Sequence, residues 1–221
     1  MTRAFKFLIL LLATCLIACS HPRHDAIPAG ATVLVLGDSL SYGTGAEKGE
    51  DYPSILATLS GWNVINAGVP GDTSADGLER LPGLLEETTP RLILVELGGN
   101  DFLRHVDRDE TRRNLATIIG KIKAKKVPVV LLAVPTPNIF GAAVGNLSDA
   151  PLYEEVGKET DVPVISDILS EVLSKNANKS DTIHPNATGY RLIGERLTLT
   201  LRELGYLSHG AAQTQSQKSS M

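Results

Sequence analysis

Three polar residues have the types and the spacing that nucleophilic catalysis requires. Asp181 stands three residues before His184 in the segment Asp-Thr-Ile-His-Pro-Asn. A carboxylate at that offset can fold back within one turn, accept the Nδ1 proton of the imidazole and leave Nε2 free for a serine hydroxyl. Ser39, in the segment Gly-Asp-Ser-Leu, follows an apolar run and is the candidate hydroxyl. The chemistry that this pattern indicates is attack by a serine on an acyl carbon.

Two further segments could stabilise the negative charge that such an attack creates. Gly71, in Val-Pro-Gly-Asp-Thr-Ser, can bring a bare backbone N–H close to a ligand. Asn100, in Gly-Gly-Asn-Asp, offers a side-chain amide that could donate to an oxyanion. Each segment taken singly also fits an ordinary turn: Asp38 or Ser39 could merely cap a helix, and Gly71 and Asn100 could merely shape loops.

His184 is the best candidate for the catalytic base by elimination. Of the five histidines, three lie before residue 31 or after residue 207, which leaves His105 and His184. His105 has no carboxylate at a matching offset, and we expect it at the rim of a cleft. Asp161 and Asp167 are alternative acids, but neither shares a loop with a histidine.

The elements that must position these residues alternate along the chain. Short runs rich in Val, Ile and Leu predict buried strands at 32–36, 62–66, 92–97, 127–134 and 162–165. Helical patterns occupy 53–59, 74–87, 110–125, 151–159 and 187–204. This alternation predicts an α/β protein, a three-layer α/β/α flavodoxin-like fold with a five-stranded parallel sheet. Ligands of such sheets bind beyond the carboxyl ends of the strands, where the polar segments fall.

The first residues predict export and lipidation. Arg3 and Lys6 precede an apolar run, Phe7 to Ile17, that is too short to span a membrane comfortably and is typical of a signal peptide. The run ends in Leu-Ile-Ala-Cys, which resembles the lipobox of bacterial lipoproteins and makes Cys19 the lipidated residue. Ser20, in place of Asp, resembles the pattern sorted to the outer membrane. We expect a cell-envelope lipoprotein facing the periplasm.

These observations predict four parts of the chain: a signal peptide over 1–18, a lipidated tether over 19–30, a catalytic domain over 31–206 and a disordered tail over 207–221. Both cysteines lie within the first 19 residues, so the domain has neither a disulfide nor a catalytic thiol. The formal net charge of -4 argues against nucleic acid as a partner. No His-Glu-x-x-His motif or cysteine cluster is present to hold a metal, and we expect no cofactor.

The four polar segments, in their order along the chain, resemble the conserved blocks of the GDSL/SGNH hydrolases. The likeness is greatest to the periplasmic thioesterase/lysophospholipase and arylesterase subgroup and covers about Ala31 to Leu204. It implies Ser39 as nucleophile, His184 as base and Asp181 as the acid that orients it, with an oxyanion hole from the N–H groups of Ser39 and Gly71 and the Asn100 amide. The implied function is hydrolysis of carboxylic esters or thioesters, including acyl esters, lysophospholipids and aryl esters, through an acyl-enzyme. We expect a monomer.

Three other functions fit parts of the sequence. A carbohydrate O-deacetylase is possible within the same superfamily, although the single tryptophan, Trp62, lies in a predicted strand and not in a sugar-stacking loop. A nucleotide-binding module is suggested by the glycines from Gly43 to Gly49, but no helix begins on the last of them and no acidic residue ends the second strand. We expect a mobile loop there that shapes the acyl pocket. A catalytically silent surface lipoprotein is the non-enzyme alternative.

Overall fold

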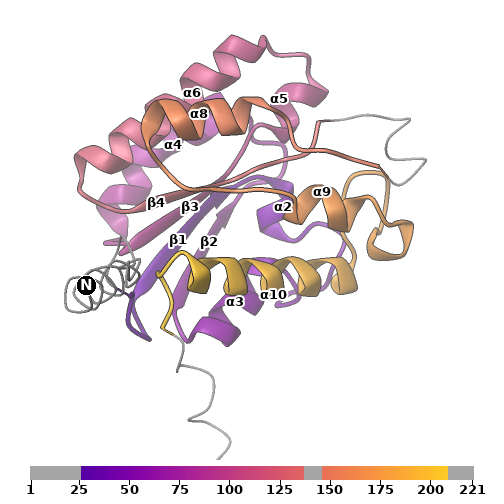
Figure 1. Ribbon diagram of the computed structural model, residues 1–221, viewed down its shortest axis with the longest axis horizontal. Coiled ribbons are helices and arrows are strands. Elements are labelled where there is room, and N and C mark those ends of the chain that lie inside the picture. The colour runs from indigo at the N-terminus through magenta and orange to yellow at the C-terminus, as the bar shows by residue number, and fades with distance from the viewer. Residues whose placement is uncertain (1–25, 137–145, 209–221) are drawn as a thin grey trace, which may run out of the picture.

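A five-stranded parallel sheet forms the centre of the protein, seen in a computed structural model that describes residues 26–136 and 146–208 (Figure 1). The strand order is β2-β1-β3-β4-β5. The strands are β1 (Thr32–Gly37), β2 (Asn63–Gly68), β3 (Leu92–Glu96), β4 (Val129–Leu132) and β5 (Val164–Ile165). This is the flavodoxin-like order, so the predicted fold class is confirmed.

The strands form where the sequence is apolar without alternation. β1 and β3 lie inside the sheet and are covered on both faces, which explains why Val33 to Leu36 are fully buried. They pair in register, with Val35 opposite Leu94 and Gly37 opposite Glu96. The carboxyl ends of β1 and β3 therefore lie side by side, and β2 ends beside β1 at Gly68.

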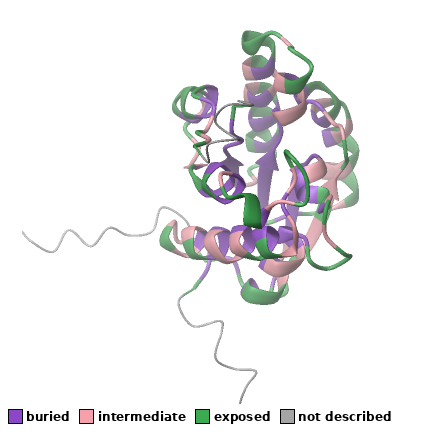
Figure 2. Cartoon of the chain, turned by 90° about the vertical axis from the view of Figure 1, so that its right-hand side faces the viewer, coloured by how far each residue is buried: buried purple, intermediate pink, exposed green. Residues whose placement is uncertain are grey.

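The long helices cover the two faces of the sheet (Figure 1). One layer contains α3 (Tyr52–Ser60), α9 (Ile168–Leu173) and α10 (Ala187–Glu203), and the other contains α4 (Ser74–Glu87), α6 (Arg108–Ala124) and α8 (Leu152–Thr160). Their buried sides face the sheet and their exposed sides face outward (Figure 2). In α6 the buried side is the one predicted from helical spacing, namely Leu115, Ile118, Ile119 and Ile122.

Several short elements were not predicted with these bounds. Two short helices, α2 (Ser39–Tyr42) and α5 (Gly99–Leu103), begin two and three residues after β1 and β3 end. The single turn η1 (Asn176–Asn178) and α9 precede the segment that contains His184. Helices of one or two turns are too short to show a hydrophobic period, which is why the sequence missed them. β4 and β5 are shorter than predicted because each apolar run begins with two partly buried residues, the second a proline, that lie before the paired strand.

The described part of the domain extends beyond the predicted limits of 31 and 206. Ile27, which the sequence assigns to the tether, is 6% exposed, and its N–H donates to the Tyr206 carbonyl. The Trp62 indole donates to the Ile27 carbonyl at 3.1 Å. Leu207, assigned to the tail, is 2% exposed. Apolar side chains at both ends of the domain thus pack on its core.

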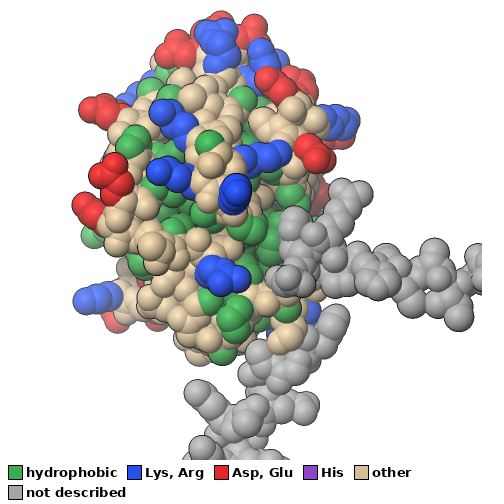
Figure 3. Space-filling view, turned by 90° about the vertical axis from the view of Figure 1, so that its left-hand side faces the viewer, with side chains coloured by type: hydrophobic (Ala, Val, Ile, Leu, Met, Phe, Trp, Pro, Cys, Tyr) green, Lys and Arg blue, Asp and Glu red, His purple; other side chains and the backbone are tan. Residues whose placement is uncertain are grey.

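The carboxyl and amino ends of the strands lie on two sides of the domain that differ in character. The polar segments lie at the carboxyl ends of the strands. The opposite face carries Lys and Arg side chains near its centre and Asp and Glu mainly around its margin (Figure 3). Among the described residues, none of the helices is both long enough and apolar enough to span a bilayer. The predicted signal peptide and Cys19 lie outside the described residues.

Candidate active site

The turn from β1 into α2 carries Ser39 as the first residue of a helix. Asp38 caps that helix, and its Oδ1 accepts the Leu40 N–H at 2.9 Å. The helix-capping role considered for this segment is therefore present, and Asp38 fills it. The same segment also places a serine near the end of a strand. One residue makes the cap and its neighbour is left free for chemistry.

Ser39, His184 and Asp181 form a connected chain of polar contacts. His184 Nε2 lies 3.0 Å from Ser39 Oγ, and His184 Nδ1 lies 2.7 Å from Asp181 Oδ2. The other carboxylate oxygen of Asp181 accepts the backbone N–H groups of Ile183 and His184, each at 2.8 Å. These two backbone bonds fix the carboxylate beside the ring. The arrangement leaves Nε2 facing the serine, as a general base requires.

The environment of Asp181 favours its charged form. Its side chain is 50% exposed, whereas that of His184 is 14% exposed. The partial burial of Asp181 acts to raise its pKa, but hydrogen bonds from the His184 ring and from two backbone N–H groups, together with the His184 charge, outweigh burial and lower the pKa. The acid therefore stays ionised and can hold the imidazole in one tautomer.

The alternative residues lie elsewhere. Asp161 follows α8 with φ +50°, and Asp167 precedes α9 with φ +65°. In the described part of the chain neither contacts His184, whose ring lies beside Asp181. His105 lies two residues after the end of α5, with φ +55°, and is not among the residues that line the cleft. Leu103, two residues earlier, does line it.

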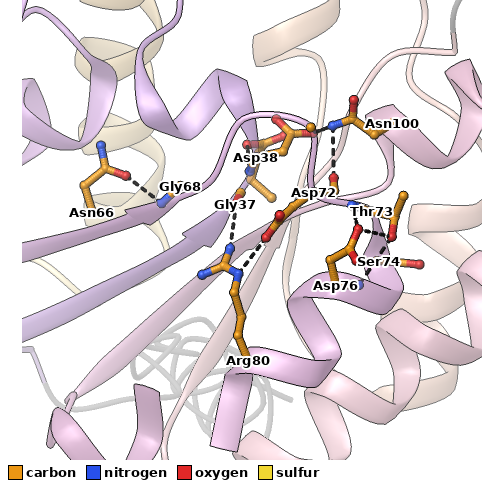
Figure 4. Close-up of polar contacts among 12 residues, drawn as sticks. Gly37, Asp38, Asn66, Gly68, Asp72, Thr73, Ser74, Asp76, Arg80 and Asn100 are labelled. Carbon is orange, nitrogen blue, oxygen red and sulfur yellow. Dashed lines mark hydrogen bonds and ion pairs between the residues drawn. The ribbon is translucent and has the colours of Figure 1, made fainter. Parts of the chain in front are cut away.

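Asn100 lies at the start of α5, and both hydrogens of its amide are already engaged (Figure 4). Nδ2 lies 3.0 Å from Asp38 Oδ2 and 2.9 Å from the Asp72 carbonyl oxygen. These two contacts fix the plane of the amide beside the nucleophile turn. When an oxyanion forms in the cleft, the amide must share one of its two N–H groups with it.

Gly71 lies in the turn between β2 and α4, with φ +89°. Its carbonyl accepts from Arg104 Nη2 at 2.7 Å. No described residue accepts from the N–H of Gly71 or from that of Ser39, so both donors are available to a ligand. The positive φ explains the glycine at this position, because other residues adopt that conformation only with strain.

Two buried carboxyl groups lie beneath the nucleophile turn and were not singled out from the sequence. Burial raises the pKa of Asp38 to about 6, against the lowering effects of the Leu40 N–H, the His184 charge and the Asn100 amide. Burial and the nearby Asp38 charge raise the pKa of Glu96 well above its usual range. Glu96 Oε2 accepts from Ser41 Oγ at 2.7 Å, and its Oε1 has no partner. No sequence signal separates these acids from ordinary strand-end residues.

Ser39, Asp181 and His184 lie in the lining of a cleft of about 840 Å³. Ser39, His184 and Asn100 line it together with largely aliphatic side chains. The apolar members are Leu40, Leu103, Val134, Leu147, Leu173 and Ile183. A cleft of this size and lining suits the apolar part of a ligand, with the polar groups gathered where the reacting bond would lie.

The loop 43–49 lies against the loop that carries His184 and is not part of the cleft lining. At Gly45, whose φ is +97°, an added Cβ would lie 2.0 Å from Ser180 Oγ and 2.6 Å from the Pro185 carbonyl oxygen. The Tyr190 hydroxyl donates to the Thr44 carbonyl at 2.8 Å. The loop therefore supports the segment that carries His184, and the prediction that it shapes the acyl pocket is not borne out. Within the described ranges, no three His, Cys, Asp or Glu side chains are grouped to hold a metal ion.

Comparison with known proteins gives a family match over more than half of the chain. Residues 35–192 match the family described as "GDSL-like Lipase/Acylhydrolase family". A relative from Escherichia coli (strain K12), "Thioesterase 1/protease 1/lysophospholipase L1", is 36% identical over 179 residues, covering 80% of this chain and 86% of that protein. An "Arylesterase" from Vibrio mimicus is 32% identical over 196 residues, covering 86% and 94%.

The fold is also found among solved structures. The crystal structure of AlinE4, titled an SGNH-hydrolase family esterase, superposes with a TM-score of 0.62 at 32% sequence identity. The match covers 80% of this chain and 96% of that one.

Proposed function

The chain belongs to the GDSL-like lipase/acylhydrolase family and is an esterase, and on that premise we propose that Ser39, His184 and Asp181 form its catalytic triad. The observation that carries the proposal is the pair of contacts at His184. Its Nε2 lies 3.0 Å from the Ser39 hydroxyl while its Nδ1 lies 2.7 Å from Asp181. This is the geometry that lets a histidine take a serine proton and return it to a leaving group.

The reaction proceeds through an acyl-enzyme. Ser39 Oγ attacks the acyl carbon as His184 Nε2 takes its proton, and the carbonyl oxygen becomes an oxyanion. His184 then gives the proton to the departing alcohol or thiol, which breaks the ester bond. A water molecule, deprotonated in turn by His184, attacks the acyl-enzyme, and the released carboxylic acid leaves Ser39 with its hydroxyl restored.

Three donors stabilise the oxyanion: the N–H groups of Ser39 and Gly71 and the amide of Asn100. Support comes from the two unengaged backbone N–H groups and from the contacts that hold the Asn100 amide beside Asp38. Donors fixed before the substrate arrives need little reorganisation when the charge develops, which is the main source of their effect on rate.

The substrate class we propose is an ester or thioester with an aliphatic or aromatic acyl chain, lysophospholipid included. The aliphatic lining of the cleft supports this proposal, since an acyl chain transferred from water gains about 0.8 kcal/mol for each buried CH₂ group. The names of the relatives, thioesterase, lysophospholipase and arylesterase, point the same way.

Carbohydrate deacetylation is less well supported. Aromatic side chains that stack on sugar rings are absent from the described lining of the cleft. Trp62 lies just before β2, at the amino end of the sheet, and is 4% exposed with its indole N–H bound to the Ile27 carbonyl. It therefore offers no stacking surface near Ser39.

We further propose that the enzyme is a lipoprotein of the bacterial envelope, anchored through Cys19, facing the periplasm and active as a monomer. The lipobox-like sequence before Cys19 supports the anchor, and Ser20 favours the outer membrane. The catalytic domain then follows a tether that begins at Cys19, and a tail follows the domain.

A panel of substrates tests the proposed function. The purified full chain is assayed with p-nitrophenyl esters from acetate to palmitate, with lysophospholipid and with acetylated glycan, and Ser39→Ala is the control. We expect hydrolysis of acyl esters that Ser39→Ala abolishes together with labelling by a fluorophosphonate. Release of acetate from glycan alone would favour the deacetylase, and stoichiometric labelling of Ser39→Ala would exclude Ser39 as the nucleophile.

A further inference from the structure

The side chain of Arg80 joins two segments that carry different parts of the site. Arg80 lies on α4, in the layer beneath the carboxyl end of the sheet. Its Nε donates to Asp72 Oδ2 at 2.7 Å, and its Nη2 donates to the Gly37 carbonyl at 2.8 Å (Figure 4). The Arg80 and Asp72 side chains are 23% and 14% exposed, so the pair is largely shielded from solvent.

Each of these partners is one residue or two from a group that would act on the substrate. Gly37 ends β1 and is followed by Asp38 and Ser39. Asp72 follows Gly71, and its carbonyl accepts from the Asn100 amide at 2.9 Å. One guanidinium group therefore contacts both the segment of the nucleophile and the segment of the oxyanion donors. Arg80 itself is not among the residues that line the cleft.

The chemistry of the guanidinium suits this role. It presents several N–H donors in a rigid planar fork, and the two bonds leave from different nitrogens. A lysine ammonium could keep an ion pair with Asp72, but as a single point of charge on a flexible stem it would not hold the carboxylate and the Gly37 carbonyl at a fixed separation. The distance between the two segments thus depends on an arginine.

We infer that Arg80 is a positioning residue, which fixes the oxyanion donors of Gly71 and Asn100 relative to Ser39. The inference rests on the proposed function, because it assigns those donors to the oxyanion. Arg80 acts through Asp72: the carboxylate and the carbonyl of that residue are held at the same time, by Arg80 and by Asn100 respectively. Freeing the carboxylate lets the turn move, and the two donors move with it.

Kinetics of Arg80→Lys and Arg80→Ala test the inference. Misplacing catalytic groups by about 1 Å can cost about 100-fold in rate. We expect Arg80→Lys to lower kcat by about 10- to 100-fold with KM changed less than about threefold, since the donors act on the transition state. Arg112→Lys is the matched control, because Arg112 is ion-paired with Glu159 on the outer helices. It should leave kcat unchanged.

A double-mutant cycle with Asn100→Ala separates positioning from general stability. If Arg80 places the Asn100 amide, Arg80→Lys should cost clearly less in the Asn100→Ala background than in the wild type. An equal fold-loss in both backgrounds, or a lowered melting temperature with unchanged kcat, would overturn the inference and leave Arg80 as a structural ion pair. A wild type that hydrolyses no ester would instead contradict the proposed function. Circular dichroism of each variant establishes that it is folded.

Discussion

The Asn100 amide donates to the Asp38 carboxylate across the floor of the cleft, with 3.0 Å between Nδ2 and Oδ2. The group expected to stabilise an oxyanion is thus oriented by the residue next to the nucleophile. Because its contribution is made in the transition state, Asn100→Ala should lower kcat by about 10²–10³ with little change in KM. Steady-state kinetics at saturating substrate measure this.

Asn100→Asp distinguishes an oxyanion donor from a turn-forming residue more clearly than Asn100→Ala does. A carboxylate at this position would face Asp38 and repel the developing charge, so its kcat should be lower than that of Asn100→Ala. A purely turn-forming asparagine would behave in the opposite way, because aspartate also favours turns and would restore a protein that alanine weakens. Wild-type kcat in Asn100→Ala, with only the melting temperature reduced, would remove Asn100 from the site.

Asp181→Asn should reduce turnover by about four orders of magnitude, because an amide can donate to Nδ1 and so hold His184 in the wrong tautomer. Asp167→Asn is the control, since Asp167 makes no contact with His184 and an asparagine tolerates its φ of +65°. The two variants are compared by kcat with one soluble ester. Near-normal turnover in Asp181→Asn would mean that another acid orients the histidine.

Asp38 should make the folded state less stable as pH rises. Its pKa is about 6 in the folded protein, raised mainly by burial from an ordinary value of 3.8. The protonated group therefore favours folding, and this contribution is present below pH 3.8 and is lost by about pH 6. Relative to wild type, Asp38→Asn should gain about 3 kcal/mol in free energy of unfolding between pH 4 and pH 7.

Urea unfolding at a series of pH values measures that gain. Asp76→Asn should change the free energy of unfolding in the opposite direction. Hydrogen bonds from the Thr73 side chain and backbone lower the pKa of Asp76. Its ionised form favours folding, so Asp76→Asn should be less stable than wild type throughout the same range. A constant difference between Asp38→Asn and wild type from pH 4 to pH 7 would contradict the raised pKa.

Cys19→Ser should move the protein from the membrane fraction to the soluble fraction without changing hydrolysis of a soluble ester. Lipid chains on Cys19 would supply the membrane affinity, and Cys19 precedes every residue of the proposed site. Cys15→Ser is the matched control and should remain membrane-bound. A Cys19→Ser protein that stays in the membrane fraction would show that another feature anchors it.

The sequence predicts the parts of the fold and the site that depend on local pattern. The apolar runs predicted five parallel strands, and the spacing of Asp181 and His184 predicted an acid beside a histidine. Contacts between distant residues were beyond its reach: Arg80 and the carbonyl it binds are 43 residues apart. Nothing in the residues near Arg80 distinguishes a guanidinium that faces the sheet from one that faces solvent.

Some misjudged elements have a physical cause that is visible only in three dimensions. The apolar run 127–134 extends beyond β4 because Val134 lines the cleft and is not part of the strand. The glycines of 43–49 suggested mobility, but Gly45 is required by the close approach of the catalytic loop. In both places the residue types are small or apolar, but the sequence does not show which other residues pack against them.

Helix α10 spans the distance between the loop that carries His184 and the point where Ile27 joins the domain. It begins three residues after His184, and its 17 residues extend about 25 Å at 1.5 Å per residue to the region where Ile27 binds Tyr206. Ile27, the first apolar residue of the described part, therefore lies on the side of the domain away from the cleft, where Lys and Arg side chains gather (Figure 3). Under the proposed anchoring at Cys19, the mouth of the cleft would lie at the end of the domain remote from the lipid.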